Sequence, residues 1–203
     1  PARPNVFDPN IGDDKIVISM NSGAQGSKVF ATAYSQSSGK YVVYEMNGYG
    51  YTDPGNVAVC SGVYEFELPG ANYNDVQVAM SSYGYEQGIV FVSSGNKVWK
   101  VELALVPRVT LLYEHPNANA KIVKLKFKYE ENDRGYFEDP SDYESYISYQ
   151  YYWCLGALVD YGDNTGGVVD MKLTAAGEID RDEPVIEHTG FGKVIDFAFV
   201  SRD

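Results

Sequence analysis

The sequence is poor in the residues on which most enzyme chemistry depends. Its 203 residues include two histidines and two cysteines. It contains no Ser-His-Asp order, P-loop, dinucleotide fingerprint or zinc motif. Its many carboxylates leave a glycosidase pair open, but no spacing singles out one pair. We therefore assign no catalytic residue, no metal and no cofactor from the sequence.

Basic residues are also scarce, with 16 Lys and Arg against 28 Asp and Glu and a formal net charge of -12. Nonspecific nucleic-acid binding depends on cationic side chains that release counterions from phosphates. The charge therefore argues against nucleic acid as a partner and leaves neutral ligands, cations and basic proteins. A run of about twenty apolar residues, which a membrane-spanning helix needs, is missing.

The chain begins with Pro1 and has neither an initiator Met nor the apolar core of a signal peptide. We expect a processed product or a piece of a longer protein. Residues 1–14, rich in Pro, Asn and Asp, are expected to form an irregular lead-in. Cys60 and Cys154 form no CxxC motif, and we interpret them as buried small apolar groups. The alternative is a disulfide in an exported protein.

The composition favours strands over helices. Eighteen Tyr and twenty Gly are typical of many short strands joined by turns, because Tyr suits strands and Gly is unfavourable in helices. The length suits one all-β domain or two small ones. We therefore predict an all-β chain.

A repeated pattern organises the sequence. Glu114-His115 precedes residues 121–127, and Glu187-His188 precedes residues 193–199. In each copy a Lys opens an alternating apolar segment, which predicts a strand with one buried face. The residues expected on that face are Val123, Leu125 and Phe127 in the first copy and Ile195, Phe197 and Phe199 in the second. A similar strand is predicted from Lys15, with Val17 inward.

Hairpin turns recur between these strands, at residues 37–39, 93–96 and 164–167. They divide the chain into approximate units 15–75, 76–120 and 121–203, each with about four short strands, which is typical of β-propeller blades. Propellers have about four to eight blades, so we expect a propeller-like array of four-stranded antiparallel blades that forms an incomplete ring, with the remaining blades in a longer parent. The alternative is a two-sheet β-sandwich.

An acidic, Tyr-rich insertion is predicted at residues 129–152. Its first part, residues 130–140, is expected to be rich in turns. Residues 141–144 fit a helix opened by a capping box, and the Tyr alternation that follows fits a strand equally well.

The same insertion supplies the candidate ligand-binding residues. Aromatic rings flanked by carboxylates and hydroxyls can stack on sugar faces and hydrogen-bond to sugar hydroxyls. The competing interpretation is that these rings pack between blades and cover a loop. The candidates are Tyr136, Phe137, Tyr143, Tyr146 and Trp153.

Two further patterns have both a chemical and a structural interpretation. The Glu-His pairs suggest a metal or acid–base site, but adjacent strand residues point in opposite directions, so we interpret His115 and His188 as structural. Residues 160–167 contain oxygen ligands for calcium without the EF-hand spacing, so we interpret them as a polar hairpin turn.

The last unit carries a family resemblance. Residues 153–173 and 190–199 resemble the C-terminal end of the PKD-like family lipoproteins, which are exported surface proteins of gram-negative gut bacteria. The resemblance implies a propeller-like region, an exported and outer-membrane or cell-surface location, and an association with glycan uptake. The family motif is structural, and it transfers no catalytic residue.

Together these observations favour a non-enzymatic binding or scaffold module of an exported surface lipoprotein, in contact with a glycan or a partner protein. The alternative is a glycoside hydrolase or lyase built on a β-propeller. The fold alone does not distinguish the binding module from the enzyme, because one fold can host many functions.

Overall fold

The computed structural model describes residues 14–22, 28–47, 59–81, 88–137 and 146–199. Within these ranges, side chains are not described at 21–22, 28, 46–47, 59–61, 81, 129–137 and 146–152. The described residues form strands, turns and one short 3-10 helix, η1 (Tyr73–Asp75). They include no helix with the length and apolar character that crossing a bilayer requires.

Twelve strands form three open four-stranded antiparallel sheets, each joined in sequence order. Sheet 1 contains β1 (Lys15–Ser22), β2 (Lys28–Ser35), β3 (Tyr41–Asn47) and β4 (Val59–Phe66). Sheet 2 contains β5 (Gln77–Ser81), β6 (Ile89–Ser94), β7 (Lys97–Glu102) and β8 (Arg108–Glu114). Sheet 3 contains β9 (Lys121–Phe137), β10 (Tyr146–Asp160), β11 (Thr165–Leu173) and β12 (Ile186–Gly192).

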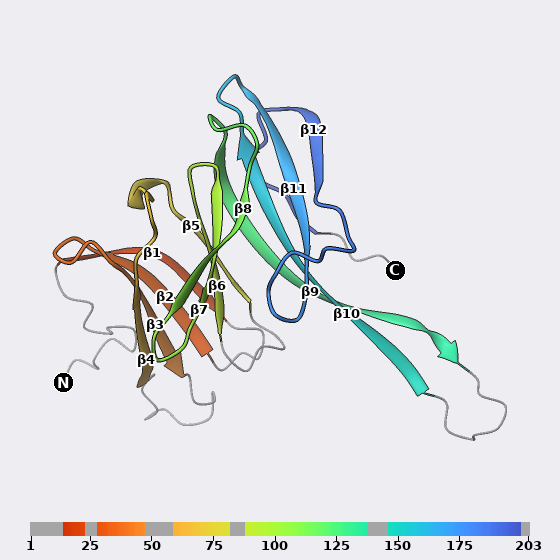
Figure 1. Ribbon diagram of the computed structural model, residues 1–203, viewed down its shortest axis with the longest axis horizontal. Coiled ribbons are helices and arrows are strands. Elements are labelled where there is room, and N and C mark those ends of the chain that lie inside the picture. Colours follow the sequence, from red (N-terminus) through yellow and green to blue (C-terminus); the bar gives the residue numbers. More distant parts are fainter. Residues whose placement is uncertain (1–13, 23–27, 48–58, 82–87, 138–145, 200–203) are drawn as a thin grey trace, which may run out of the picture.

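These sheets confirm the prediction of an all-β chain with repeated four-stranded antiparallel sheets, and they number three rather than the two of a sandwich. Sheet 2 lies between the other two (Figure 1). The first strands lie next to one another, because β5 contacts both β1 and β9. None of the three sheets in the described part of the chain closes on itself, and the propeller ring stays a prediction.

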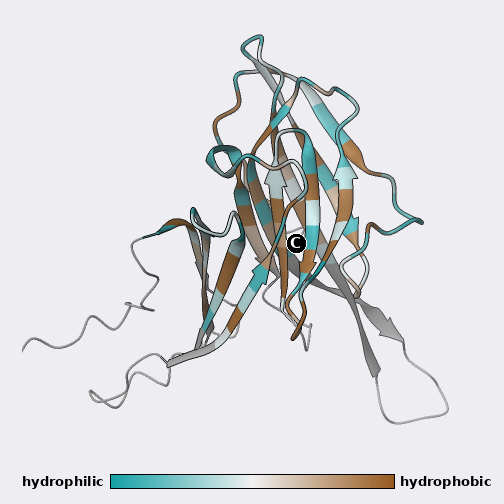
Figure 2. Ribbon diagram, turned by 60° about the vertical axis from the view of Figure 1, so that its left-hand side comes forward, coloured by the Kyte–Doolittle hydropathy of each residue, from teal (hydrophilic) through white to brown (hydrophobic). Residues whose placement is uncertain are grey.

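Strand β6 shows why sheet 2 is central. All six of its residues are buried, because the strand alternates between two cores. Phe91 packs with Leu155 and Met171 of sheet 3, whereas Val90 and Val92 pack with sheet 1. A continuous apolar run bounded by turns is typical of a strand covered on both faces. Apolar residues concentrate along the strands where the sheets meet (Figure 2).

Glycine and asparagine close the predicted hairpin turns. Gly39 (φ 70°), Gly95 (φ 59°) and Asn164 (φ 66°) adopt left-handed backbone conformations between paired strands. Such conformations are inexpensive for Gly and tolerated by Asn. These turns fix the register of the strands that they join.

In the first strands of sheets 1 and 3, the side chains do not alternate between faces as predicted, because each strand contains a register shift. In β1 the shift falls between Val17 and Ser19, and Val17 is exposed while Ile18 packs on the core. In β9, residues 122 and 124 pair with adjacent residues of β10, which leaves Val123 exposed and Ile122 buried. A β-bulge inserts one residue and so reverses the faces on one side of it. The predictions that Val17 and Val123 face inward were therefore wrong.

The predicted strand at 193–199 is also wrong. Glu187 and His188 lie within β12 rather than at its end, and the strand stops at Gly192. Residues 193–199 form no strand and cross the outer face of sheet 3, where Phe197 and Phe199 lie over Gly156. We call these residues the tail.

The predicted turn-rich insertion is instead largely strand. Residues 130–137 continue β9, and residues 146–152 belong to β10. The pair forms a long hairpin that projects from sheet 3 (Figure 1). Residues 141–144, for which helix and strand were both considered, lie outside the described residues.

Candidate functional site

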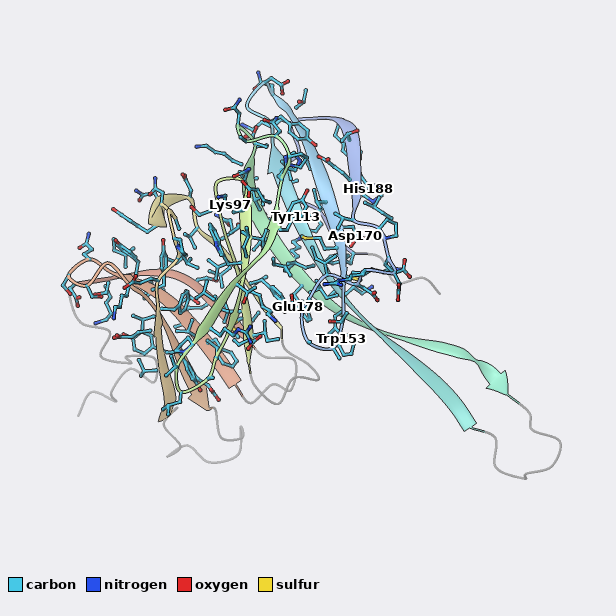
Figure 3. All side chains as sticks on the ribbon, viewed as in Figure 1. Lys97, Tyr113, Trp153, Asp170, Glu178 and His188 are labelled. Carbon is cyan, nitrogen blue, oxygen red and sulfur yellow. The ribbon has the colours of Figure 1, made fainter. Side chains whose placement is uncertain are left out.

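The candidate ligand-binding residues lie along the projecting hairpin. The backbone register places Tyr136 opposite Ile147 and Phe137 opposite Tyr146. Tyr143 lies outside the described residues. Trp153, at the base of the hairpin, is partly buried and packs against the core between sheets 2 and 3 (Figure 3). Ligand binding by these five residues stays a prediction, and Trp153 also has a packing role.

In the structure, the glutamate and the histidine of each Glu-His pair make separate contacts. Glu114 lies near Lys97, with a carboxylate oxygen 3.6 Å from the ammonium nitrogen. His188 lies on the exposed strand β12 and pairs with Val168 of β11 (Figure 3). The histidine of the first pair contacts the glutamate of the second, because His115 hydrogen-bonds to Glu187, 72 positions later in the sequence. No adjacent pair converges, as the alternation of strand side chains requires.

His115 is positioned by the loops around it. It follows β8, and its backbone N–H donates to the carbonyl of Asn96, whose side-chain amide donates to the His115 carbonyl. The Asn117 N–H donates to Nδ1 at 3.1 Å, so Nε2 carries the ring proton and donates to Glu187 Oε1 at 2.9 Å. The side chain is 3 % exposed. Both ring nitrogens are therefore occupied.

Tyr161 completes this group, which we call the histidine cluster: His115, Tyr161 and Glu187. The Tyr161 hydroxyl donates to the same oxygen of Glu187, and its ring centroid lies 5.9 Å from that of His115. Burial, together with the hydrogen bond to Glu187, raises the pKa of Tyr161 to about 12. Burial acts to raise the pKa of Glu187, but the hydrogen bonds from Tyr161 and His115 outweigh it and lower that pKa.

The histidine cluster connects sheets rather than opening to a substrate. His115 follows sheet 2, whereas Tyr161 and Glu187 belong to sheet 3 and its β10–β11 turn. A general base must reach the proton that it abstracts, and neither nitrogen of His115 has a vacant position for one. The geometry therefore favours a structural bond between the two sheets.

A second polar connection between the same sheets escaped the sequence analysis. Lys100 shares a face of β7 with Val98, toward the core between sheets 2 and 3, and its side chain is 3 % exposed. Its ammonium group lies 2.8 Å from Glu102 and also pairs with Glu178, beyond β11 (Figure 3). Burial acts to lower the pKa of Lys100, but the two glutamates outweigh it and raise that pKa. The sequence feature that could have indicated this connection is a Lys at an inward-facing position of a strand whose apolar residues alternate.

Residues 160–167 form a turn, as interpreted from the sequence. Asp160 accepts a hydrogen bond from the Gly162 N–H at 2.8 Å, and Asp163 accepts one from the Thr165 N–H at 3.0 Å. Such side-chain bonds to the backbone two residues on are typical of Asx turns. Among the described residues, no three His, Cys, Asp or Glu side chains gather closely enough to hold a metal ion.

Of the cysteines, Cys154 is buried on β10, which agrees with its interpretation as a small apolar group. Cys60 belongs to β4, and its side chain lies outside the described part of the chain.

A groove of about 640 Å³ lies where the first strands converge. It is lined by Met20 of β1, residues 78–80 of β5, residues 125–128 of β9, and Ala198 and Phe199 of the tail. We call it the inner groove. Its lining includes Met20, Met80 and Phe127 as well as Lys126 and Lys128. Binding sites for small molecules commonly have this size and combine apolar walls with a few polar groups.

Comparisons with known proteins add no assignment to this geometry. A scan against models of protein families, a search of curated proteins and a search of solved structures find no match to the chain. The resemblance to the PKD-like family lipoproteins therefore stays a prediction.

Proposed function

We propose that the chain is a non-enzymatic binding and scaffold module made of propeller-like sheets, and that the inner groove binds an oligosaccharide. The observation that carries this proposal is the convergence of β1, β5 and β9 on one groove. In a propeller the first strands of successive blades likewise surround a central channel. As in such a stack, each sheet here needs a neighbour to bury its faces.

The lining supports an oligosaccharide as the ligand class. Phe127 and Phe199 offer ring surface for sugar faces, and the lining also contains the polar side chain of Lys128. The projecting hairpin, with Tyr136 and Tyr146, lies on the strands that continue from sheet 3 and would extend the binding surface.

The polar groups support binding rather than catalysis. The histidine cluster and Lys100 are engaged in contacts between sheets 2 and 3. By resemblance to the PKD-like family lipoproteins, the module would belong to an exported protein at the cell surface. It would hold a glycan there or contact a partner protein.

The test is a screen of the full chain against an oligosaccharide panel by calorimetry, with product release followed by chromatography. We expect binding without turnover. Met20→Glu should weaken binding at least tenfold, because the charge enters the apolar wall of the groove. Val63→Glu is the matched control, since both side chains belong to residues that are 55 % exposed on sheet 1 and Val63 lies outside the groove.

Each result of this screen has a consequence. Turnover would overturn the non-enzymatic assignment and favour the hydrolase or lyase. Equal weakening by Met20→Glu and Val63→Glu would remove the groove as the site. Loss of binding in a Tyr136→Ala, Tyr143→Ala double variant, with Met20→Glu unaffected, would move the site to the hairpin.

A further inference from the structure

The tail (residues 193–199) lies on a receptor surface formed by two strands of sheet 3. Asp196 Oδ1 lies 2.9 Å from the ammonium nitrogen of Lys124 and 2.7 Å from that of Lys126. Both lysines belong to β9 and face away from the core, because they alternate with the buried Leu125. These hydrogen bonds hold the pKa of Asp196 far below its usual range. The chain thus places two cations on one carboxylate.

Lys126 makes further contacts with the residue after Asp196. Its ammonium group donates to the Phe197 carbonyl and lies 5.1 Å from the centroid of the Phe197 ring. The first contact is a hydrogen bond to the backbone of the tail, and the second is a cation–π contact that requires an aromatic ring. One lysine therefore recognises an acidic residue, the aromatic ring that follows it and the carbonyl of that aromatic residue.

Gly156 makes room for the rings. A Cβ atom built on Gly156 would lie 2.8 Å from Cζ of Phe199 and would also overlap the Phe197 ring. The two rings pack edge to face, with centroids 5.8 Å apart. Gly156 pairs with Lys126 across the β9–β10 ladder, so the flat position and the cation lie side by side. The surface therefore fits an acidic residue followed by aromatic residues one and three positions later.

The tail occupies this surface without a strand ladder. Residues 193–199 form no strand, and their described contacts run through side chains and the Phe197 carbonyl. Ile195, in the middle of the tail, is 82 % exposed. Gly190 (φ 86°) and Gly192 lie among the last three residues of β12, immediately before the tail, and a Cβ at either glycine would meet open space. Glycines near such a junction allow the following segment to take another direction.

From these contacts we infer that this surface of sheet 3 binds the tail of a second copy of the chain, so that two copies exchange tails. A tail in trans finds the same two lysines, the same glycine and the same carbonyl partner. Exchange of an identical element costs little because no contact changes its chemistry. Charge complementarity selects this partner, since the surface presents Lys124 and Lys126 and the tail supplies Asp196.

The test uses two full-length charge-reversed variants. In K124E/K126E the surface repels its own tail, and in D196K the tail is repelled by its own surface. Mixed together, the D196K tail complements the K124E/K126E surface. Light scattering should give the 22.5 kDa monomer for each variant alone and twice that mass for the mixture. We expect association in the mixture to be at least tenfold stronger than in either variant alone.

Gly156→Ala supplies the specificity control. Added to both variants, it should abolish the heterodimer, because the new methyl group takes the place of the two rings on each surface. A mixture that stays monomeric while both variants remain folded by circular dichroism would overturn the inference. A heterodimer that survives Gly156→Ala would also overturn it, since charge alone would then explain the association.

A second measurement covers the case in which K124E/K126E does not fold. A fluorescent peptide of residues 193–199 is titrated into the full D196K chain and into the unaltered chain. We expect binding to D196K to be at least tenfold tighter, because the tail of the unaltered chain competes for the surface. Equal binding to both chains, or binding to neither, would refute a tail-binding surface on sheet 3.

Discussion

The two interfaces between sheets are stabilised in different ways. Between sheets 1 and 2, the described contacts are apolar and aromatic, with Val43 and Phe66 facing Val92 and Trp99. Near them, the linker residue Asn72 donates a neutral hydrogen bond to Ser94. Between sheets 2 and 3, an apolar core of similar kind is joined by two connections to carboxylates, the hydrogen bond of His115 to Glu187 and the ion pair of Lys100 with Glu178.

This difference shows where the molecule responds to pH. Apolar burial depends on area and does not titrate, whereas ion pairs lose their attraction when one partner changes charge. Acid should therefore weaken the interface between sheets 2 and 3 before the interface between sheets 1 and 2. The following variants test the comparison in order of expected effect.

The largest effect is expected from Phe91→Ala, in the apolar core between sheets 2 and 3. The side chain is fully buried, and truncation of a buried Phe to Ala lowers the free energy of unfolding by roughly 3–5 kcal/mol. Urea denaturation followed by tryptophan fluorescence measures it. Val63→Ala on exposed β4 is the control and should change stability by less than about 0.5 kcal/mol. A loss below about 1 kcal/mol for Phe91→Ala would show that this core does not hold the sheets.

An intermediate effect is expected from His115→Ala. It removes a buried ring, the acceptor of the Asn117 N–H and one of the two donors to Glu187, which should cost roughly 1–3 kcal/mol. His188→Ala is the matched control, because His188 is exposed on β12 and makes no part of the histidine cluster. Equal effects of the two variants, measured by urea denaturation, would contradict the assignment of His115 as a connection between sheets.

Glu187→Gln tests the pH dependence of the same connection. A carboxyl whose pKa is lowered by folding stabilises the fold above its ordinary pKa of about 4.3, and the contribution is lost as the pH falls through the lowered value. The stability of the unaltered chain should therefore fall relative to Glu187→Gln as the pH drops below the ordinary pKa of about 4.3. Parallel profiles in thermal denaturation would show that Glu187 carries no linkage.

The smallest effect is expected from Ser94→Ala, near the interface of sheets 1 and 2. It removes the hydrogen bond that the Asn72 N–H donates at 3.0 Å and the longer one that the hydroxyl donates to the Asn72 carbonyl at 3.4 Å, both neutral, and should cost about 1 kcal/mol. Because no charge is involved, the cost should be the same at pH 4 and pH 7. A cost that changes with pH would contradict the claim that the interface between sheets 1 and 2 responds less to pH than the interface between sheets 2 and 3.

The sequence predicted most of the strands because their signals are local. Gly and Asn mark the turns, and alternating apolar residues mark strands such as β7 and β11. The bulges in β1 and β9 were missed because the inserted residue has no chemical signature of its own. The tail was mistaken for a strand because its alternation of apolar residues serves contact with Gly156 rather than a ladder.

The candidate site shows the same division. Its residue types were visible in the sequence, including the two histidines and the aromatic run. The inner groove was not, because it forms where residues of β1, β5, β9 and the tail meet. Lys100 was missed as well, since its partner Glu178 lies 78 positions away.

By itself, then, the sequence determined an all-β chain of repeated four-stranded sheets, because turn chemistry and side-chain alternation act within a few residues. Only the tertiary structure decided that His115 of one repeat meets Glu187 of the next, and that the tail covers Gly156. The physical reason is that these contacts depend on how whole sheets pack. Packing is set by the summed burial of many side chains rather than by any local pattern.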